Sequence, residues 1–395
     1  MAKKKQSTRR SKAAVGLVVG TTKGVFLLEA SRSRRGWTQR APALLGSKVF
    51  DARADPRRPE HMLATVSGGH LGPTVFRSTN RGRTWTEAKS PPRFGTSKSK
   101  KPTKRGGTRG HTVAVNFYLA PGHSDEEGTW YLGTAPQGLF RSEDGGDTWS
   151  EVEGWGHHPK WHSWTKGGAD ASPDGAFLHS IQVDPRDAKH LFVNLSMGGT
   201  FESLDAGASW SPLNAGVAMD FFPGEPPEFG HDPHSMVQHP GDPDRLYQQN
   251  HCGIYRLDRA LGTTWRRIGE RMPKSIGDIG FPMVPHPTDP ERVWVFPMDG
   301  TELWPRTSKQ GKPAVYATTN GGKRWQRLDA GFPERDAWWT VLRQAMCADD
   351  RARGTGLYLG TTSGEVWASR DEGQSFACIA RHLPRVQSVR FVRWS

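Results

Sequence analysis

The sequence predicts an all-β protein, a seven-bladed β-propeller with four-stranded blades, and three observations lead to this prediction. A short motif, S-x-D-x-G-x-x-W, recurs along the chain. An apolar strand that closes on a turn rich in Asp, His and Pro precedes most copies by about 20 to 30 residues. The closing aromatic residues of the motif run from Trp37 to Phe376 at a mean spacing of about 56 residues, which suits one blade with its loops.

The motif has a physical reason for its spacing. In each copy, the Asp or Asn oxygen is expected to accept backbone N–H groups of its own turn, and the Gly to supply a positive φ. The Trp then returns to the core at the start of the next strand, so we expect these carboxylates to be structural and not catalytic. Five copies are close to the pattern and two are degraded: Ser78–Trp85, Ser142–Trp149, Ser203–Trp210, Thr318–Trp325 and Ser369–Phe376, then Asp258–Trp265 and Ser31–Trp37.

The predicted units cover six blades, and the two ends of the chain share the seventh. Strands between Val15 and Trp37 are expected to pair with an orphan strand, Val386–Val392, which closes the ring and removes an exposed edge. A count of six or eight blades is the alternative. The six complete units are 48–87, 111–152, 178–213, 234–269, 280–329 and 338–380.

Nearly all of the net charge of +14 lies in two short segments. Residues 1–12 carry six basic groups and residues 93–109 carry seven, with no acidic group in either. We expect a basic, disordered tail over 1–12 and a single propeller domain over 13–395, with a mobile basic loop at about 93–109. No aromatic side chains interleave with these lysines to stack bases, so we expect no nucleic-acid binding beyond non-specific contact.

The composition also bears on the compartment. No stretch approaches the roughly 20 apolar residues that cross a bilayer, so no membrane association is expected. The apolar run Ala13–Gly20 continues without a small-residue cleavage site, which argues against a signal peptide. Cys252, Cys347 and Cys378 are odd in number and lack C-x-x-C spacing, which argues against a disulfide framework or a structural zinc. A cytoplasmic location is the expectation.

The motif is that of the Asp-box, or BNR, repeat, and from Val15 to Trp394 the chain resembles the bacterial sialidase-like BNR-repeat propellers, glycosyl hydrolase proteins of unproven activity. The resemblance implies a hydrolase. A true sialidase would need an arginine triad, a Tyr–Glu nucleophile pair and an Asp acid. The Arg-Ile-Pro signature of sialidases is missing, because the equivalent region, Gly20–Gly24, reads GTTKG. True sialidase activity is therefore not expected.

Four long connections between blades are expected on the face opposite the repeated turns, and long loops on a rigid scaffold commonly carry function. One of them contains Trp161 and Trp164 among histidines. Such a mixture fits the wall of a ligand pocket, whereas simple packing of the loop is an equal alternative. The connections are 88–110, 153–178, 214–233 and 270–279.

Histidines of four neighbouring blades are predicted to gather at the mouth of the central channel. His111, His179 and His234 each open a predicted innermost strand, and His70 and His251 each sit where a second strand ends. Two interpretations remain open. The imidazoles bind a divalent metal ion, which would be the only cofactor, or they form a hydrogen-bonded polar lining without metal.

The candidate roles follow from these positions and from the pKa of imidazole near neutrality. The expected metal ligands and acid–base groups are His179, His234 and His251, with Gln249, Asn250 or Asp232 completing the shell. Arg343 is expected to face the channel as a further catalytic candidate, and the carboxylate partners would be Asp232, Asp170 or Glu228. The expected ligand-binding residues are His70, His111, Trp161, Trp164, Asn250, Gln249 and Phe281.

The leading hypothesis is a hydrolase- or lyase-type enzyme, glycosidase-like or metal-dependent, that binds a small polar and carbohydrate-like molecule. A non-enzymatic propeller that docks a protein partner or assists assembly is the second hypothesis. A polyanion binder that uses the two basic segments is the third.

Overall fold

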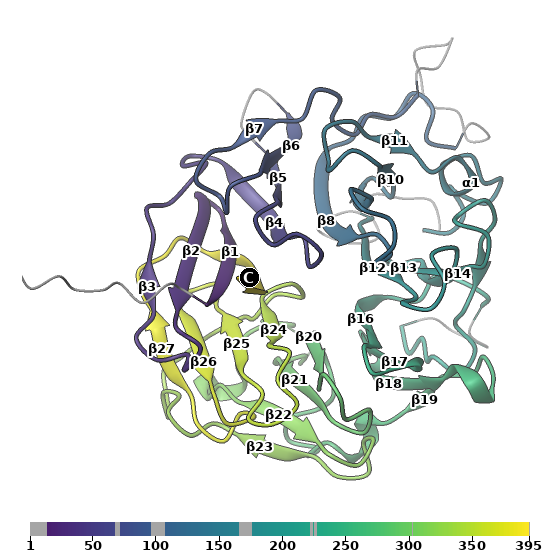
Figure 1. Ribbon diagram of the computed structural model, residues 1–395. Coiled ribbons are helices and arrows are strands. Elements are labelled where there is room, and N and C mark those ends of the chain that lie inside the picture. Colours follow the sequence, from purple (N-terminus) through teal and green to yellow (C-terminus); the bar gives the residue numbers. More distant parts are fainter. Residues whose placement is uncertain are drawn as a thin grey trace, which may run out of the picture.

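The structure, a computed structural model, describes residues 14–67, 72–95, 107–165, 176–221, 224, 227–301 and 303–394. Seven four-stranded antiparallel sheets stand around a common axis, as blades of a propeller (Figure 1). The seven-bladed fold predicted from the repeats is confirmed. No helix within the described ranges is long and apolar enough to cross a membrane. The expected basic tail lies outside these ranges, as does most of the basic loop.

Each blade is given from its innermost to its outermost strand. The first three are β28 (Val386–Arg393), β1 (Val15–Thr21), β2 (Gly24–Ala30), β3 (Thr38–Gln39); β4 (Lys48–Ala54), β5 (Met62–Ser67), β6 (Pro73–Ser78), β7 (Thr86–Glu87); and β8 (Val115–Pro121), β9 (Trp130–Ala135), β10 (Leu139–Ser142), β11 (Ser150–Glu151). The fourth and fifth are β12 (Leu178–Val183), β13 (Leu191–Leu195), β14 (Gly199–Ser203), β15 (Ser211–Pro212); and β16 (Pro233–His239), β17 (Asp242–Asn250), β18 (Gly253–Asp258), β19 (Arg266–Arg267). The last two are β20 (Gly280–Pro285), β21 (Val293–Pro297), β22 (Val315–Thr318), β23 (Gln326–Leu328); and β24 (Met346–Ala348), β25 (Leu357–Gly360), β26 (Val366–Ser369), β27 (Ala377–Ala380).

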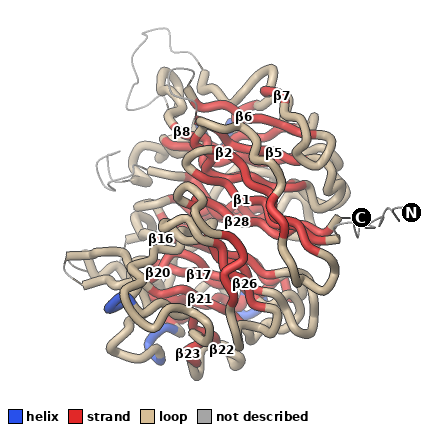
Figure 2. The backbone as a smooth tube through the Cα atoms, turned by 90° about the vertical axis from the view of Figure 1, so that its left-hand side faces the viewer, coloured by secondary structure: helices blue, strands red, loops and turns tan. Residues whose placement is uncertain are grey.

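Helical structure is confined to the connections between strands. The described pieces are α1 (Glu153–Gly156) and the 3-10 turns η2 (Arg259–Leu261), η3 (Gly269–Arg271) and η4 (Lys309–Gly311). Figure 2 shows the strands between two layers of loops, with the C-terminal end of the chain in one layer. The two layers define the two faces of the propeller.

The ring closes through the predicted pairing of the first and last strands. β28 runs antiparallel to β1 from the pair Val15–Arg393 to the pair Thr21–Val386. Because β28 is the innermost strand of a blade that otherwise comes from the N-terminal region, the two ends of the described chain build one sheet. Through this pairing the blade at the chain ends has four strands, like the other six.

The repeated turns form the hydrogen bonds expected from the motif. In the copy at Asp205, the Ser203 hydroxyl accepts the Gly207 N–H at 2.8 Å, and Asp205 accepts the Ser209 N–H at 2.8 Å. The Trp210 indole N–H donates to the Gly207 carbonyl at 3.0 Å, while Gly207 has a φ of 88°. The other close copies repeat the first two bonds at Asn80, Asp144, Asn320 and Asp371. These bonds fix the conformation of each turn, and the aromatic side chain that follows the turn packs into the core.

Candidate functional site

Three polar residues of the fifth blade converge where its inner strand begins. Asp232 directly precedes β16, His234 lies within β16, and His251 lies in the turn between β17 and β18. The His251 N–H donates to the Asp232 carbonyl at 2.9 Å, which fixes the turn against the strand. Oδ2 of Asp232 lies 3.5 Å from Nε2 of His234 and 3.6 Å from Nδ1 of His251. We call these three residues the His–Asp cluster.

Neighbouring backbone groups orient the cluster. Nδ1 of His234 lies 2.7 Å from the carbonyl oxygen of Gly280 in β20. A carbonyl only accepts, so Nδ1 donates to it, and Nε2 is the ring nitrogen that faces the cluster. The Met197 N–H donates to Oδ1 of Asp232 at 3.2 Å, which leaves Oδ2 facing the two imidazoles. Backbone groups outside the cluster therefore fix both ligands.

The cluster has the size and donor set of a divalent metal site. Its three potential ligand atoms all lie within 4.8 Å of one another. An ion about 2.0–2.2 Å from each ligand in tetrahedral geometry separates the ligands by roughly 3.3–3.6 Å, close to the two separations measured at Asp232. Two imidazoles and one carboxylate also leave positions for water or substrate.

Electrostatics favours the metal-binding forms of Asp232 and His251. Burial alone would raise the pKa of Asp232, but the hydrogen bond and charge of His234, together with His251 and Arg343, lower that pKa to about 2. Burial lowers the pKa of His251, and the neighbouring His234 lowers it further. At neutral pH the carboxyl is therefore anionic and the His251 imidazole neutral, the states that bind a metal ion.

His179 lies beside the cluster but not in it. Its Nδ1 lies 2.8 Å from the Ser180 hydroxyl and its Nε2 lies 3.1 Å from the Pro233 carbonyl. Burial, with the charge of Arg343, puts the pKa of His179 well below its usual value. Both ring nitrogens are thus engaged, and the imidazole supports the segment that carries Asp232. The structure joins two of the three predicted metal ligands with Asp232 and places the third behind them.

A cavity of about 590 Å³ lies at the channel mouth next to the cluster. The inner strands and adjoining loops of six of the seven blades contribute to its wall. Among the described residues of the wall there are four cationic side chains and no Asp or Glu. The cationic residues are Lys48, Arg306, Arg343 and Arg385, and the aromatic ones are Phe50, Phe117, Phe177 and Phe281. We call this space the cationic cavity.

Two aromatic side chains separate the cluster from the cationic cavity. The Phe281 ring lies 5.0 Å from the His234 ring and 5.6 Å from the Arg343 guanidinium. The Trp304 rings lie 4.8 Å from the His251 ring and 3.8 Å from the guanidinium of Arg306. Only one layer of aromatic side chains would therefore separate a ligand in the cavity from the cluster.

Sequence reasoning placed only Arg343 and Phe281 of this cavity in the site. It missed Lys48, Arg306 and Arg385. Lys48 opens an inner strand and Arg385 directly precedes one, and the same positional rule that selected His111 and His234 could have found them. Arg306 lies in the connection between β21 and β22 and carries no comparable signal.

The two predicted tryptophans are in the protein core. Trp161 and Trp164 are 2% and 1% exposed and pack with Trp155 beneath the connection that follows β11. The Trp161 indole N–H donates to the Gln137 carbonyl at 3.0 Å. Both indoles pack the loop against the blade. In this structure they expose almost no surface to a ligand, whereas the predicted role in a pocket wall would require exposed surface.

The predicted amides and His111 are also engaged within the protein. Asn250 accepts the Cys252 N–H at 3.0 Å, and the Gln249 amide donates to the Asp278 carbonyl at 2.8 Å. The His111 ring lies 5.3 Å from that of Trp161, and burial lowers the His111 pKa.

The other carboxylate candidate within the described chain, Glu228, lies away from the cluster. It is exposed and forms an ion pair with Lys160 at 3.2 Å. His70 and Asp170, also predicted at the site, lie outside the described residues.

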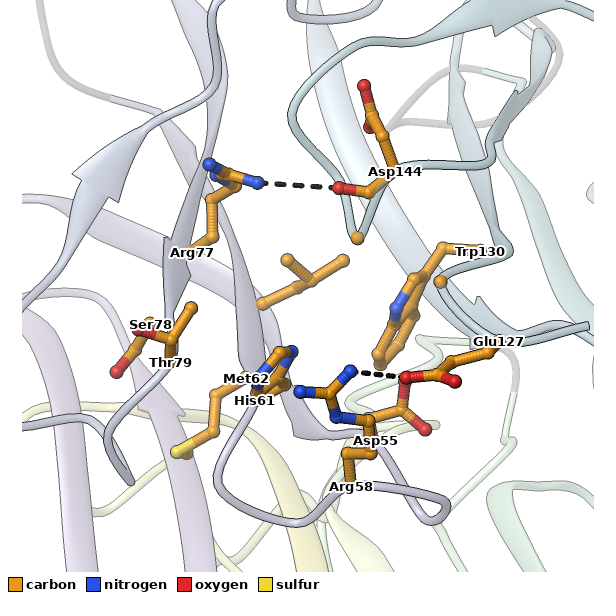
Figure 3. Close-up of a pocket in the computed structure, with 13 residues that line it drawn as sticks. Asp55, Arg58, His61, Met62, Arg77, Ser78, Thr79, Glu127, Trp130 and Asp144 are labelled. Atoms are coloured by element: carbon orange, nitrogen blue, oxygen red, sulfur yellow. Dashed lines mark hydrogen bonds and ion pairs between the residues drawn. The ribbon is translucent and has the colours of Figure 1, made fainter.

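A second hollow, of about 350 Å³, lies by the repeated turns, between the blades of β4–β7 and β8–β11 (Figure 3). Its polar groups bridge the two blades. Arg58 pairs with Glu127, and Arg77 donates to the Asp144 carbonyl at 3.4 Å. These bonds connect neighbouring blades, so the polar residues of this hollow have a structural role.

No family model matches the chain. An oligoxyloglucan-reducing end-specific xyloglucanase of Emericella nidulans is 28% identical over 220 residues, which are 52% of this chain and 24% of that protein. A probable enzyme of the same kind from Neosartorya fischeri is 23% identical over 313 residues, 72% of this chain and 34% of its own length. The chain thus spans about a quarter to a third of these curated relatives.

Solved structures with the same fold include a GH74 xyloglucanase from Xanthomonas campestris, with a TM-score of 0.62 at 20% identity over 92% of this chain and 51% of that one. A putative 6-phosphogluconolactonase from Bacteroides uniformis gives a TM-score of 0.55 at 10% identity, over 96% of this chain and all (100%) of that one. At these identities the likeness shows the propeller fold and nothing about chemistry.

Proposed function

We propose that this protein is a metal-assisted hydrolase of the BNR-repeat propeller type, which acts on a small, carbohydrate-like molecule at the mouth of its channel. The observation that carries the proposal is the convergence of Asp232, His234 and His251 beside a cavity of about 590 Å³. This volume is within the usual range of small-molecule sites. The sequence match to xyloglucan-hydrolysing relatives supports a carbohydrate-like ligand, and the hydrogen-bonded repeat turns support the BNR assignment.

The geometry favours metal-assisted hydrolysis over the two-carboxylate glycosidase mechanism. That mechanism needs two carboxyl groups about 5–9.5 Å apart on either side of the scissile bond. The described wall of the cationic cavity has no carboxylate. Asp232, a partly buried carboxylate beside the cavity, uses Oδ1 for the Met197 N–H and directs Oδ2 at the two imidazoles. Such a carboxylate is suited to hold an ion.

Asp232, His234 and His251 would hold the ion. A divalent ion in such a site polarises the bond to be cleaved and acidifies a water molecule. Asp220 lies close enough for its charge to act on His251, and both residues line a hollow of about 460 Å³ next to the cluster. We therefore assign Asp220 as the candidate general base, which would take the proton from the attacking water.

Metal analysis tests this proposal. We expect the purified protein, after treatment with a chelator, to take up one Co²⁺ or Zn²⁺ per chain, with a Co²⁺ absorption spectrum typical of nitrogen and oxygen ligands. The variants His234→Ala and Asp232→Asn should lose this uptake. His61→Ala is the matched control, because His61 lines the hollow on the opposite face.

Hydrolysis of a panel of p-nitrophenyl glycosides and esters should depend on the added ion. Equal uptake by His234→Ala and the unaltered protein would refute the metal site. An absence of both uptake and hydrolysis would instead favour the alternative, a propeller that docks a protein partner.

A further inference from the structure

A series of buried polar side chains begins at the turn that carries His251. The side-chain carbonyl of Asn250 accepts the Cys252 N–H at 3.0 Å, so Asn250 closes the turn around His251. The Asn250 amide donates to the side-chain carbonyl of Gln248 at 3.1 Å, and the Gln248 amide donates to the Thr200 hydroxyl at 2.6 Å. These hydrogen bonds connect the turn in the fifth blade with β14 in the fourth.

The hydrogen bonds of this series all run in one direction. The Thr200 hydroxyl donates to the side-chain carbonyl of Asn194 at 3.1 Å, so each group between Asn250 and Asn194 accepts from one neighbour and donates to the next. Hydrogen bonds arranged in this way polarise and strengthen one another in a protein interior. Asn250, Gln248, Thr200 and Asn194 are each at most 1% exposed, so bulk water does not compete for them. We call these four side chains the polar network.

Packing alone does not account for a polar side chain at position 248. Gln248 of β17 pairs with Met236 of β16, and in the next blade Val295 of β21 pairs with Met283 of β20. Val295 is fully buried, so a hydrophobic side chain fills the corresponding place one blade further on. Burial of an amide is unfavourable unless it is hydrogen-bonded. The amide of Gln248 therefore stabilises through its hydrogen bonds, which lead to the turn of His251.

The orientation of the His251 ring depends on this turn. A backbone carbonyl orients the ring of His234, whereas within the described chain no such hydrogen bond holds the ring of His251. The turn is also anchored on its other side, because the Gln249 amide donates to the Asp278 carbonyl at 2.8 Å. The position of the His251 imidazole beside Asp232 is thus set by the backbone between the polar network and Gln249.

We infer that the polar network holds the His251 turn in its metal-binding position, and that Gln248 and Thr200 are positioning residues of the His–Asp cluster. The inference rests on the proposed function in one respect only, that His251 is a metal ligand. Removal of groups that orient metal ligands commonly weakens metal binding by about 10–100-fold. With the turn released, the cluster should bind an ion as a site of two ligands, Asp232 and His234.

Thr200 offers a matched pair of variants. Thr200→Val removes the hydroxyl and keeps the shape of the side chain, whereas Thr200→Ser keeps the hydroxyl and removes a methyl group. We expect chelator-treated Thr200→Val to bind Co²⁺ about tenfold or more weakly than the unaltered protein, as measured by titration against a competing chelator. Thr200→Ser should bind Co²⁺ about as tightly as the unaltered protein. The affinity should follow the hydroxyl, whatever either variant does to the melting temperature.

Two further variants locate the effect. Gln248→Met should weaken Co²⁺ binding as Thr200→Val does, since it interrupts the same series of hydrogen bonds. Gln137→Met is the control, because the Gln137 amide is also buried and donates to the Trp161 carbonyl at 3.3 Å in another blade. In a His251→Ala background, the two Thr200 variants should bind Co²⁺ equally, because the network acts through that ligand.

Hydrogen exchange in the metal-free protein tests the turn itself. The Cys252 N–H is bonded to Asn250, and the His251 N–H is bonded to the Asp232 carbonyl at 2.9 Å. We expect both amides to exchange about tenfold faster in Thr200→Val than in Thr200→Ser. The turn at Ser369–Phe376, in a distant blade, is the internal reference and should exchange equally in the two variants.

The outcomes separate this inference from the proposed function. Faster exchange at the His251 turn, in a protein that takes up no Co²⁺, would overturn the metal site and leave the control of the turn by the polar network standing. Equal exchange in Thr200→Val and Thr200→Ser would overturn the inference, whatever the metal analysis shows. Equal Co²⁺ affinity of these two variants, or an equal loss of affinity in Gln137→Met, would overturn it as well.

Discussion

One buried ion pair ties the closing strand of the ring to the next blade. Arg390 of β28 donates to both carboxylate oxygens of Asp51 in β4, at 2.9 and 3.0 Å. The Asp51 side chain is fully buried, at 0% exposure, and that of Arg390 is 16% exposed. Removal of one partner from a buried pair leaves an uncompensated charge and costs about 3–5 kcal/mol. We predict that Arg390→Met strongly destabilises the propeller.

The surroundings place the cost near the lower end of that range. In Arg390→Met, Asp51 would keep the Leu119 N–H at 3.2 Å and would have Arg53 at 3.5 Å. We therefore expect a loss of about 3 kcal/mol in the free energy of unfolding. Equilibrium urea unfolding followed by tryptophan fluorescence measures it. Asp51→Asn combined with Arg390→Met should cost less than the sum of the two single changes, because neither charge is then left alone.

The same strand supplies the control. Arg393 pairs with Asp350, and both side chains are 53% exposed. Exposed ion pairs contribute about 0–1 kcal/mol, so Arg393→Met should change the free energy of unfolding little. If Arg390→Met and Arg393→Met unfold at the same urea concentration, burial does not set the strength of these pairs and the reasoning fails.

The remaining predictions concern the turns, the packing and the thiols. Asp205→Ala should cost about 1–2 kcal/mol in urea unfolding, whereas Asp205→Asn should be nearly neutral at pH 7, since Asn stands at this position in two other repeats. The hydrogen bond from Ser209 lowers the pKa of Asp205 in the folded protein. The ionised carboxylate therefore stabilises the fold above the unfolded pKa of about 4, and this stabilisation is lost as the pH falls through the lower pKa of the folded state. If the difference in unfolding free energy between the unaltered protein and Asp205→Asn does not change with pH across that window, this reasoning is wrong. Gly133→Ala should destabilise the protein by about 2 kcal/mol or more, because a Cβ there would lie 2.2 Å from the Leu178 carbonyl oxygen. An unchanged midpoint of urea unfolding would show that the blades of β9 and β12 can move apart at little cost. Burial raises the pKa of Cys347 to about 12, so its thiol should react with a disulfide reagent at about pH 8 far more slowly in the folded than in the unfolded protein, and equal rates would argue against that burial.

Sequence reasoning succeeded where local chemistry determines structure. The repeated turns carry their own hydrogen bonds within eight residues, as at Ser203–Trp210, so each copy predicts the same turn wherever it occurs. Ring closure followed from the orphan strand, because an unpaired inner strand has one partner available. These two inferences were enough for the blade count and the blade boundaries.

The site depended on contacts between residues far apart in the sequence, and there the prediction was incomplete. The pattern gave no reason to rank His179 below Asp232, because the Pro233 carbonyl that engages His179 lies 54 residues away along the chain. The buried position of Trp161 depends on the Gln137 carbonyl, which lies 24 residues away in the turn between β9 and β10. Charge counting by segment also hid the cationic cavity, since Lys48 and Arg385 meet only after the ring has closed.

The shared blade also sets the order in which the cavity can be assembled. Arg385 directly precedes β28, and Arg343 lies three residues before β24, so two of the four cations follow the first five complete blades along the chain. Synthesis must therefore pass Arg385 before the cavity can have all four of its cations. Chains that end before Arg385, although they already carry the His–Asp cluster, would lack part of the cavity wall and the strand that closes the ring.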